Sequence, residues 1–332
     1  MANLLTDSYG RTIRDLRISL TDRCNFRCFY CRPVMEGNFA GKEKILTYEE
    51  IVKVAEIFVS LGIEKIRLTG GEPLLRKEVE TVIADLSKLK PGLKDIALTT
   101  NGFSLAKRAR DLKEAGLDRI TISLDSLKRE NFKEITGADK LDEVLFAIDC
   151  AKKENLQPLK VNVVVIKNYN DDEIVDFARF AREKEISVRF IEFMPLDSGH
   201  EWKRDVLVSS KEIRQKIEKV YPLKLKEKFR GSSTAWNFGF ADGVKGEIGI
   251  IAPVTEMFCG ACSRIRLTAD GQIRTCLFSN TEYDLREVLR SGASRDEIVQ
   301  FIKQTVLKKE KRHHINDADF VKPERTMSLI GG

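Results

Sequence analysis

The sequence predicts an α/β protein built on a parallel sheet with a polar cavity on one side of it. Three observations support this prediction. Short aliphatic runs alternate with helical patterns through the first 194 residues, the runs are polar at every second position, and three cysteines follow the first run. Such alternation gives a parallel sheet with right-handed crossovers. The spacing fits an open doubly wound sheet or a partial barrel, and both carry a site at the strand C-termini.

Six strands and the helices between them are expected in this part of the chain. The helix at 47–61 has the clearest bounds, because Thr47 and Glu50 form a capping-box pattern and Gly62 follows the last turn. The strands are expected at 16–20, 65–69, 96–100, 119–124, 160–166 and 188–193, and the other helices at 77–89, 104–115, 140–154 and 171–184.

The strands carry a second signal, because alternate residues of a strand face opposite sides. A buried parallel sheet usually has nearly continuous aliphatic strands, whereas one side is repeatedly polar here. We therefore expect helices on the aliphatic side and a hydrated cavity for an anionic ligand on the polar side. An antiparallel sheet with one face in water is the alternative, and the intervening helices argue against it. The polar side holds Arg17, Ser19, Arg67, Thr69, Thr99, Asn101, Thr121, Ser123, Asp125, Lys160 and Asn162.

Cys24, Cys28 and Cys31 follow the first strand with the spacing Cys-x3-Cys-x2-Cys. Thiolates are the usual ligands of iron–sulfur clusters, and a [4Fe–4S] cluster has four irons to ligate. Three close cysteines therefore leave one iron open to bind a small molecule. Zinc is the alternative, although it prefers Cys-x2-Cys pairs and a closed tetrahedron.

The turn Gly70-Gly71-Glu72-Pro73 follows the second strand. Glycine allows close backbone approach, and a carboxylate such as that of Glu72 can accept hydrogen bonds from an ammonium group. An ordinary turn is the alternative.

The regular alternation breaks at about residue 195, which divides the chain into a domain at 1–194 and an extension at 195–332. The extension contains loops, a charged helix near 209–220 and a Gly-rich stretch around 231–249, and we expect it to pack across the sheet. Cys150 belongs to neither a cysteine cluster nor a loop. It falls on the helix at 140–154 and is expected to be a buried structural thiol.

A second cysteine set, Cys259, Cys262 and Cys276, encloses the segment Ser-Arg-Ile-Arg-Leu. Strand alternation places Arg264 and Arg266 on one side of that segment, beside the cysteines. Guanidinium groups bind phosphate oxygens bidentately, although a structural ion-pair role is the alternative. The three histidines, His200, His313 and His314, do not have zinc-finger spacing.

Composition indicates a soluble, cytoplasmic protein. The chain has 332 residues, 42% of them hydrophobic, and contains no run near the about 18 apolar residues of a membrane helix. No secretory signal is visible at the N-terminus. Seven cysteines in such a chain favour metal binding over disulfides. The net charge of +6 is a weak nucleic-acid signal and fits a polyanionic small molecule equally well.

The first cysteine set, with an aromatic residue before its last cysteine, resembles the signature of the radical S-adenosylmethionine (SAM) superfamily. Two three-cysteine sets, the Ser-Arg-Ile-Arg segment and the C-terminal Gly331-Gly332 closely resemble the GTP 3′,8-cyclase (MoaA) family of molybdenum cofactor biosynthesis. The resemblance covers the whole chain. Another radical SAM enzyme, such as a peptide-modifying maturase, and a zinc- and nucleic-acid-binding protein remain as alternatives.

The resemblance implies a partial (βα)6 TIM-type barrel closed by the C-terminal extension, two [4Fe–4S] clusters and SAM. It implies that GTP is cyclised to 3′,8-cyclo-7,8-dihydro-GTP, that an electron donor supplies electrons, and that a MoaC-type synthase uses the product. No nucleic acid or membrane is implied, and a homodimer is left open. Cys24, Cys28 and Cys31 would hold one cluster, and Cys259, Cys262 and Cys276 the other. SAM would contact Tyr30, Gly71, Ser123 and Met194, GTP would contact Arg17, Arg67, Thr99, Lys160, Arg264, Ile265 and Arg266, and Arg17, Arg266, Gly331 and Gly332 would be catalytic.

Overall fold

The computed structural model describes residues 4–32, 39–197 and 202–331. All strands of these residues belong to one sheet, in the order β12-β11-β10-β1-β2-β3-β4-β5-β6-β9-β8-β7. Within it, β10, β1 to β6 and β9 form a parallel run, which confirms the predicted parallel α/β class. The strands are β1 Asp15–Ser19, β2 Lys65–Thr69, β3 Asp95–Thr100, β4 Arg119–Ser123, β5 Lys160–Val165, β6 Ser187–Glu192, β7 Leu223–Leu225, β8 Trp236–Phe240, β9 Glu247–Ile251, β10 Arg264–Leu267, β11 Gln272–Arg274 and β12 Tyr283–Asp284.

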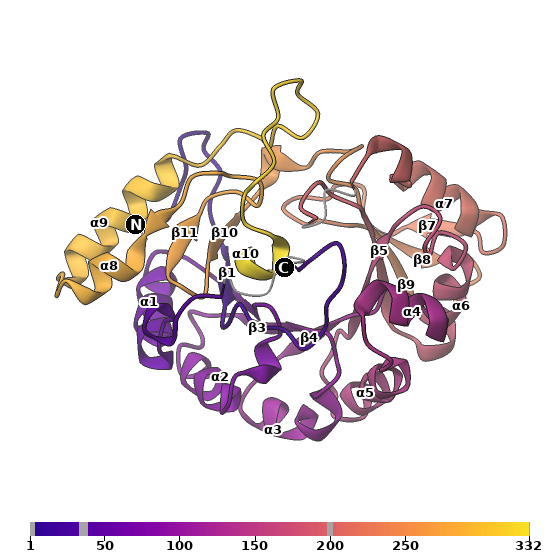
Figure 1. The fold of residues 1–332 in the computed structure, drawn as a ribbon, viewed down its shortest axis with the longest axis horizontal. Helices are drawn as coiled ribbons and strands as arrows, with labels where there is room; N and C mark the ends of the chain where they lie inside the picture. Colours follow the sequence, from indigo (N-terminus) through magenta and orange to yellow (C-terminus); the bar gives the residue numbers. More distant parts are fainter. Residues whose placement is uncertain (1–3, 33–38, 198–201, 332) are drawn as a thin grey trace.

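The sheet curves around an interior, and its helices follow the outer side of that curve (Figure 1). The short helix α10 and the C-terminus lie inside the curve. The helices are α1 Tyr48–Ser60, α2 Val79–Ser87, α3 Ala109–Glu114, α4 Arg129–Thr136, α5 Leu141–Lys153, α6 Ile174–Lys184, α7 Ser210–Glu218, α8 Leu285–Arg290, α9 Arg295–Leu307 and α10 Met327–Ile330.

Local sequence signals set several of these bounds. Thr47 accepts a hydrogen bond from Glu50 N and the Glu50 side chain accepts one from Thr47 N, so the predicted capping box begins α1. The helix expected at 104–115 is instead broken into a 3-10 turn, Leu105–Lys107, and α3. Helix α4 was not predicted from the sequence.

The C-terminal part extends the sheet at both edges instead of only packing across it. β9 pairs in parallel with β6, and β10 pairs in parallel with β1. Antiparallel strands follow outward, with β8 and β7 at one edge and β11 and β12 at the other. In the described residues the sheet remains open between β12 and β7, so the expected closure of a barrel by the extension is not made by strand pairing.

The aliphatic side of the strands forms the main core, as the alternation predicts. Leu16, Ile66 and Val161 are at most 1% exposed and belong to one cluster with apolar residues of the outer helices. The polar side of the same strands therefore faces the interior of the curve. No helix among the described residues is long and apolar enough to cross a membrane.

Candidate functional site

The first cysteine set lies on the loop after β1. Cys24 Sγ accepts hydrogen bonds from Phe26 N at 3.4 Å and from Asn101 Nδ2 at 3.8 Å. Cys31 N donates to Cys28 O at 2.9 Å, so the loop turns back on itself. Burial raises the pKa of Cys24 to about 11 and that of Cys31 to about 12. Because metal ligation needs thiolates, metal binding at this loop would release protons.

The turn after β2 is hydrogen-bonded to the residues that lead into the cysteine loop. Gly71 N donates to Thr21 O at 2.7 Å, and Glu72 N donates to Arg23 O at 2.7 Å. A Cβ at Gly71 would lie 2.3 Å from Arg23 O, so glycine alone allows this approach.

The carboxylate of Glu72, which the sequence suggested as an acceptor for an ammonium group, is buried and bonded within the protein. Its side chain accepts hydrogen bonds from Leu74 N at 2.9 Å, Thr100 Oγ1 at 2.7 Å and Asn101 N at 2.7 Å. Glu72 is 1% exposed, and burial raises its pKa to about 7. The carboxylate therefore ties the loops after β2 and β3 together, and the expectation of an ammonium contact is corrected.

The predicted SAM residues lie along the interior near this loop. Tyr30 donates a hydrogen bond to Asp125 Oδ2, and its ring packs against Phe193 with the centroids 6.2 Å apart. Ser123 ends β4 and is half-buried. Met194 follows β6 and lines the cavity of the second cysteine set.

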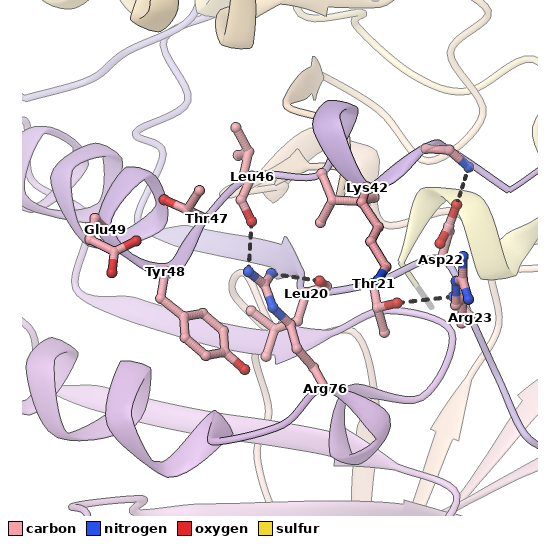
Figure 2. Close-up of a pocket in the computed structure, with 12 residues that line it drawn as sticks. Leu20, Thr21, Asp22, Arg23, Lys42, Leu46, Thr47, Tyr48, Glu49 and Arg76 are labelled. Carbon is pink, nitrogen blue, oxygen red and sulfur yellow. Dashed lines mark hydrogen bonds between the residues drawn. The ribbon is translucent and has the colours of Figure 1, made fainter.

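A separate pocket of about 520 Å³ lies outside the start of the cysteine loop (Figure 2). Arg76 crosses it and donates hydrogen bonds to Leu20 O at 2.8 Å and to Leu46 O at 2.7 Å. The Arg76 guanidinium also lies 4.0 Å from the centre of the Tyr48 ring. These contacts hold the end of β1, from which the cysteine loop starts. Among the described residues, none of the predicted site residues lines this pocket.

A cavity of about 400 Å³, here called the cationic cavity, lies at the N-terminal ends of β1 to β5. Its lining includes eight cationic side chains and only two carboxylates, so it favours an anionic ligand. The cavity lies on the polar side of the strands, as the alternation predicted, but toward their N-terminal ends and not at the C-terminal ends where the sequence analysis expected the site. The charged lining residues are Asp15, Arg17, Lys65, Arg67, Asp95, Arg119, Lys160, Arg189, Arg230 and Arg264.

The cationic cavity leaves much of its charge uncompensated. Arg119 is paired with Asp95, whereas the Arg67 guanidinium donates to the neutral hydroxyls of Thr99 at 3.0 Å and Thr121 at 3.2 Å. Burial, with the nearby Arg119, holds the pKa of Arg67 well below its ordinary value. Burial, with the nearby Arg189, lowers the pKa of Lys160 to about 7. An anion bound here would favour the charged forms of both side chains.

The second cysteine set lines an adjoining cavity of about 190 Å³, here called the cysteine cavity. Burial raises the pKa of Cys276 to about 11. Burial opposes ionisation of Cys262 too, but Arg264 and Lys309 outweigh it and lower the pKa of Cys262 to about 7. Lys309 is 4% exposed, and its ammonium donates to Arg264 O at 2.9 Å. Three thiols beside buried cations suit an anionic metal–thiolate group.

The donor chemistry of the two cysteine sets fits iron–sulfur clusters, because each set consists of three cysteines and thiolates are the usual ligands of such clusters. Across residues 4–32, 39–197 and 202–331, no three Cys, His, Asp or Glu side chains are close enough to hold a single metal ion.

The cationic cavity and the cysteine cavity adjoin along the interior. They have five lining residues in common, so one elongated molecule can reach from the cysteines to the cationic cavity. Arg266 lines only the cysteine cavity, beside Arg264, as the alternation predicted. The common residues are Arg17, Asn162, Thr234, Ile251 and Arg264.

The C-terminal tail enters the interior beside these cavities. Ser328 N donates to Cys31 O at 3.4 Å, and the buried Arg266 guanidinium donates to Gly331 O. A Cβ at Gly331 would lie 3.1 Å from both Ser19 Oγ and Thr69 Cγ2. The tail therefore connects the first cysteine loop with β10. Gly332, which was predicted to be catalytic, lies outside the described residues, as does His200.

Two predicted residues are placed differently by the structure. Ile265 is 1% exposed and lies in the hydrophobic core on the opposite side of β10 from Arg264 and Arg266, so its side chain is not in the predicted GTP site. Cys150 was expected to be buried but is only half-buried on α5. It lies on the same helix face as Phe146, one turn earlier, which is 63% exposed.

Several site residues were missed in the sequence. Arg189 lies in the predicted strand 188–193 at the position where alternation puts polar residues inside, so this signal was present. Lys309 and Arg230 carried no such signal, because each comes from the irregular C-terminal part and reaches the site only through the fold.

Comparison with known proteins links this geometry to one family. The family model described as Radical SAM superfamily matches residues 18–181, and the model described as Molybdenum Cofactor Synthesis C matches residues 186–315. The chain is 47% identical over 334 residues to the GTP 3′,8-cyclase of Thermodesulfovibrio yellowstonii, covering 99% of this chain and 100% of that protein. It is 45% identical to the GTP 3′,8-cyclase of Corynebacterium glutamicum, covering 99% of this chain and 89% of that protein.

A solved structure of Streptococcus suis SuiB bound to S-adenosylmethionine has a similar fold. The TM-score is 0.66 at 12% identity, and the match covers 96% of this chain and 77% of the SuiB chain. At this identity the likeness concerns the fold alone.

Proposed function

The chain belongs to the GTP 3′,8-cyclase family of the radical SAM superfamily, whose reaction is the first step of molybdenum cofactor biosynthesis, and we propose that its two adjoining cavities hold GTP for this reaction. The observation that carries the proposal is the continuous interior. The cationic cavity and the cysteine cavity have lining residues in common, and the C-terminal tail, which lines the cysteine cavity with Met327, contacts the first cysteine loop at Cys31.

A [4Fe–4S] cluster and SAM are implied by the superfamily, and Cys24, Cys28 and Cys31 fit as the cluster ligands. When bound, these groups supply the electron and the 5′-deoxyadenosyl radical that removes hydrogen from the ribose. The protein positions this chemistry with Gly71, which keeps the β2 turn against the cysteine loop. We assign the SAM contacts to Tyr30, Gly71, Ser123 and Met194.

The cysteine cavity is the proposed site of the guanine base. Cys259, Cys262 and Cys276 are proposed to hold a second [4Fe–4S] cluster there. Lys309 and Arg264 offset the negative charge that three thiolates bring into a buried space, as the lowered pKa of Cys262 indicates. Such compensation favours a metal–thiolate group in a buried site.

The cationic cavity is the proposed site of the triphosphate. Arg17 and Arg264 line both cavities and can contact the part of the nucleotide nearest the base. Arg67, Thr99 and Lys160 line the cationic cavity but not the cysteine cavity. For Arg67 and Lys160, burial and neighbouring arginines outweigh the favourable charge of Asp95. Fixing base and triphosphate at two places holds the ribose between them and makes ring closure intramolecular.

Arg266 and the tail are proposed to act beside the reacting ribose. Arg266 donates a hydrogen bond to the carbonyl of Gly331, which places the tail beside β10, β1 and β2. The proposed catalytic group is Arg17, Arg266, Gly331 and Gly332.

Two partners follow from the chemistry. A low-potential electron donor must supply the electrons, and a MoaC-type synthase must consume the cyclic nucleotide. Both belong to the proposal and are testable by adding each component to the purified enzyme.

Paired cysteine variants test this division of the interior. The anaerobically reconstituted enzyme should hold about eight irons per chain, and Cys28→Ser and Cys276→Ser about four each. Cys28→Ser should make no 5′-deoxyadenosine while still binding GTP. Cys276→Ser should cleave some SAM but lose productive GTP binding. Normal SAM cleavage by Cys28→Ser, or unchanged GTP affinity in Cys276→Ser, would contradict the assignment.

A further inference from the structure

The loop between β7 and β8 forms one wall of the cationic cavity. It supplies Arg230, Ser232, Ser233 and Thr234 to the lining, and none of them was indicated by the sequence. The loop is fixed in place, because Arg264 Nη1 donates to Ser232 O at 2.9 Å and Ser233 N donates to Arg230 O at 3.2 Å.

Aromatic contacts also fix the Arg230 guanidinium. It lies 5.0 Å from the ring centre of Trp236 and 5.0 Å from that of Phe258. Arg264 lies 5.2 Å from the same Phe258 ring, so two guanidinium groups flank the residue that precedes Cys259. Cation–π contacts of this kind orient a guanidinium without using its N–H donors.

One N–H group of the Arg230 guanidinium has no hydrogen-bond acceptor among the described residues. Arg230 Nη1 is buried, and among the described residues it has no hydrogen-bond partner. Leaving a buried donor unsatisfied typically costs about 1–3 kcal/mol, and more for a charged group. Burial, which outweighs the favourable effect of Glu256, holds the pKa of Arg230 below its ordinary value. Nη1 of this half-buried side chain is thus oriented and desolvated, and it finds no acceptor in the part of the chain that the structure describes.

We propose that Arg230 donates through Nη1 to the triphosphate of the nucleotide, with the hydroxyls of Ser232 and Thr234 as further donors. This inference rests on the proposed function and adds a phosphate contact supplied by the C-terminal part of the chain. Arg230 is a binding residue in this account, because it lines the cationic cavity and is not part of the lining of the cysteine cavity.

The test compares Arg230→Ala with Lys228→Ala in the reconstituted holoenzyme. Both variants remove one positive charge from the same loop, but Lys228 is exposed and does not line the cationic cavity. Equilibrium dialysis should show GTP binding weakened at least tenfold by Arg230→Ala, which is about 1.4 kcal/mol, and changed less than about twofold by Lys228→Ala. The affinity for guanosine, which has no triphosphate, should be the same in both variants as in the wild type.

Two further measurements separate this result from misfolding. Arg230→Lys keeps the charge without the planar fork and should recover part of the GTP affinity. Iron content should stay at the wild-type value in all three variants, since Phe258 adjoins the second cysteine set. Wild-type GTP affinity in Arg230→Ala, or equal losses for GTP and guanosine, would overturn the inference. Failure of the unmodified holoenzyme to bind GTP would instead reject the proposed function itself.

Discussion

At the scale of single residues, the main feature of the site is a group of buried cationic side chains that outnumber the carboxylates around them. Arg67, Lys160 and Arg266 face the interior, and burial lowers the pKa of all three. Burying a charge is unfavourable unless it is paired with an opposite charge. These side chains therefore destabilise the fold when no ligand is bound, and a bound anion relieves this cost. This arrangement predicts that a polyanionic ligand binds strongly and also stabilises the fold.

Lys160 gives this prediction a pH dependence. Its pKa is about 7 in the free protein, so the side chain loses its positive charge as the pH rises through that value. Bound triphosphate favours the charged form and raises the pKa again. From about pH 7 to about pH 9, GTP binding should therefore take up a proton and weaken as the pH rises.

Calorimetry in two buffers of different ionisation enthalpy measures this proton uptake. Lys160→Met has no titrating amine at this position, so it should bind GTP more weakly at about pH 7 and show little pH dependence above it. The same proton uptake in the wild type and in Lys160→Met would assign the effect to another group.

At the scale of elements, the C-terminal tail connects parts of the site that lie far apart in the sequence. Arg325 pairs with Asp270 at 2.8 Å and with Glu282 at 2.9 Å, which holds the chain before α10. Helix α10 then passes the first cysteine loop, and Gly331 reaches β1 and β2. Chain ends normally fray, so these contacts indicate a positioned element.

Gly331→Ala tests whether this position matters. Gly331 has φ +87°, which is strained for alanine, and a Cβ there would meet Ser19 Oγ and Thr69 Cγ2 at 3.1 Å, so these side chains or the tail must move by a few tenths of an ångström. We expect cyclo-GTP formation to fall at least tenfold, with iron content and thermal unfolding near wild type.

Gly292→Ala is the matched control for this variant. Gly292 has nearly the same backbone conformation, φ +82°, but nothing lies within 4 Å of the position that a Cβ would take there. It should carry the backbone strain of a left-handed alanine and keep normal turnover. Equal turnover by both variants would show that the tail has no role in the reaction.

At the scale of the whole molecule, the fold was largely predictable up to residue 194. Periodicity and capping identify strands and helices there, because each signal is local, as for Thr47 and Glu50 at the start of α1. Strand alternation alone also predicts that Arg17, Arg67 and Thr99 face the interior, where all three line the cationic cavity.

The remainder depends on long-range contacts that no local pattern reveals. β9 and β10 are short strands separated by a loop, and they pair with opposite edges of the first six strands. Arg230 and Lys309 reach the interior only because of that pairing. Glu72 was misinterpreted for a similar reason, since its partners Thr100 and Asn101 lie at the end of another strand, β3.

The central claim is that SAM cleavage and GTP binding occur in one interior, so that the radical formed from SAM reaches the ribose of the bound GTP. Turnover of GTP carrying deuterium at C3′ tests it most directly. The account predicts that the 5′-deoxyadenosine formed in the anaerobic reaction carries the deuterium, in an amount matching the cyclo-GTP formed. Unlabelled 5′-deoxyadenosine, produced at the same rate with and without GTP, would contradict it.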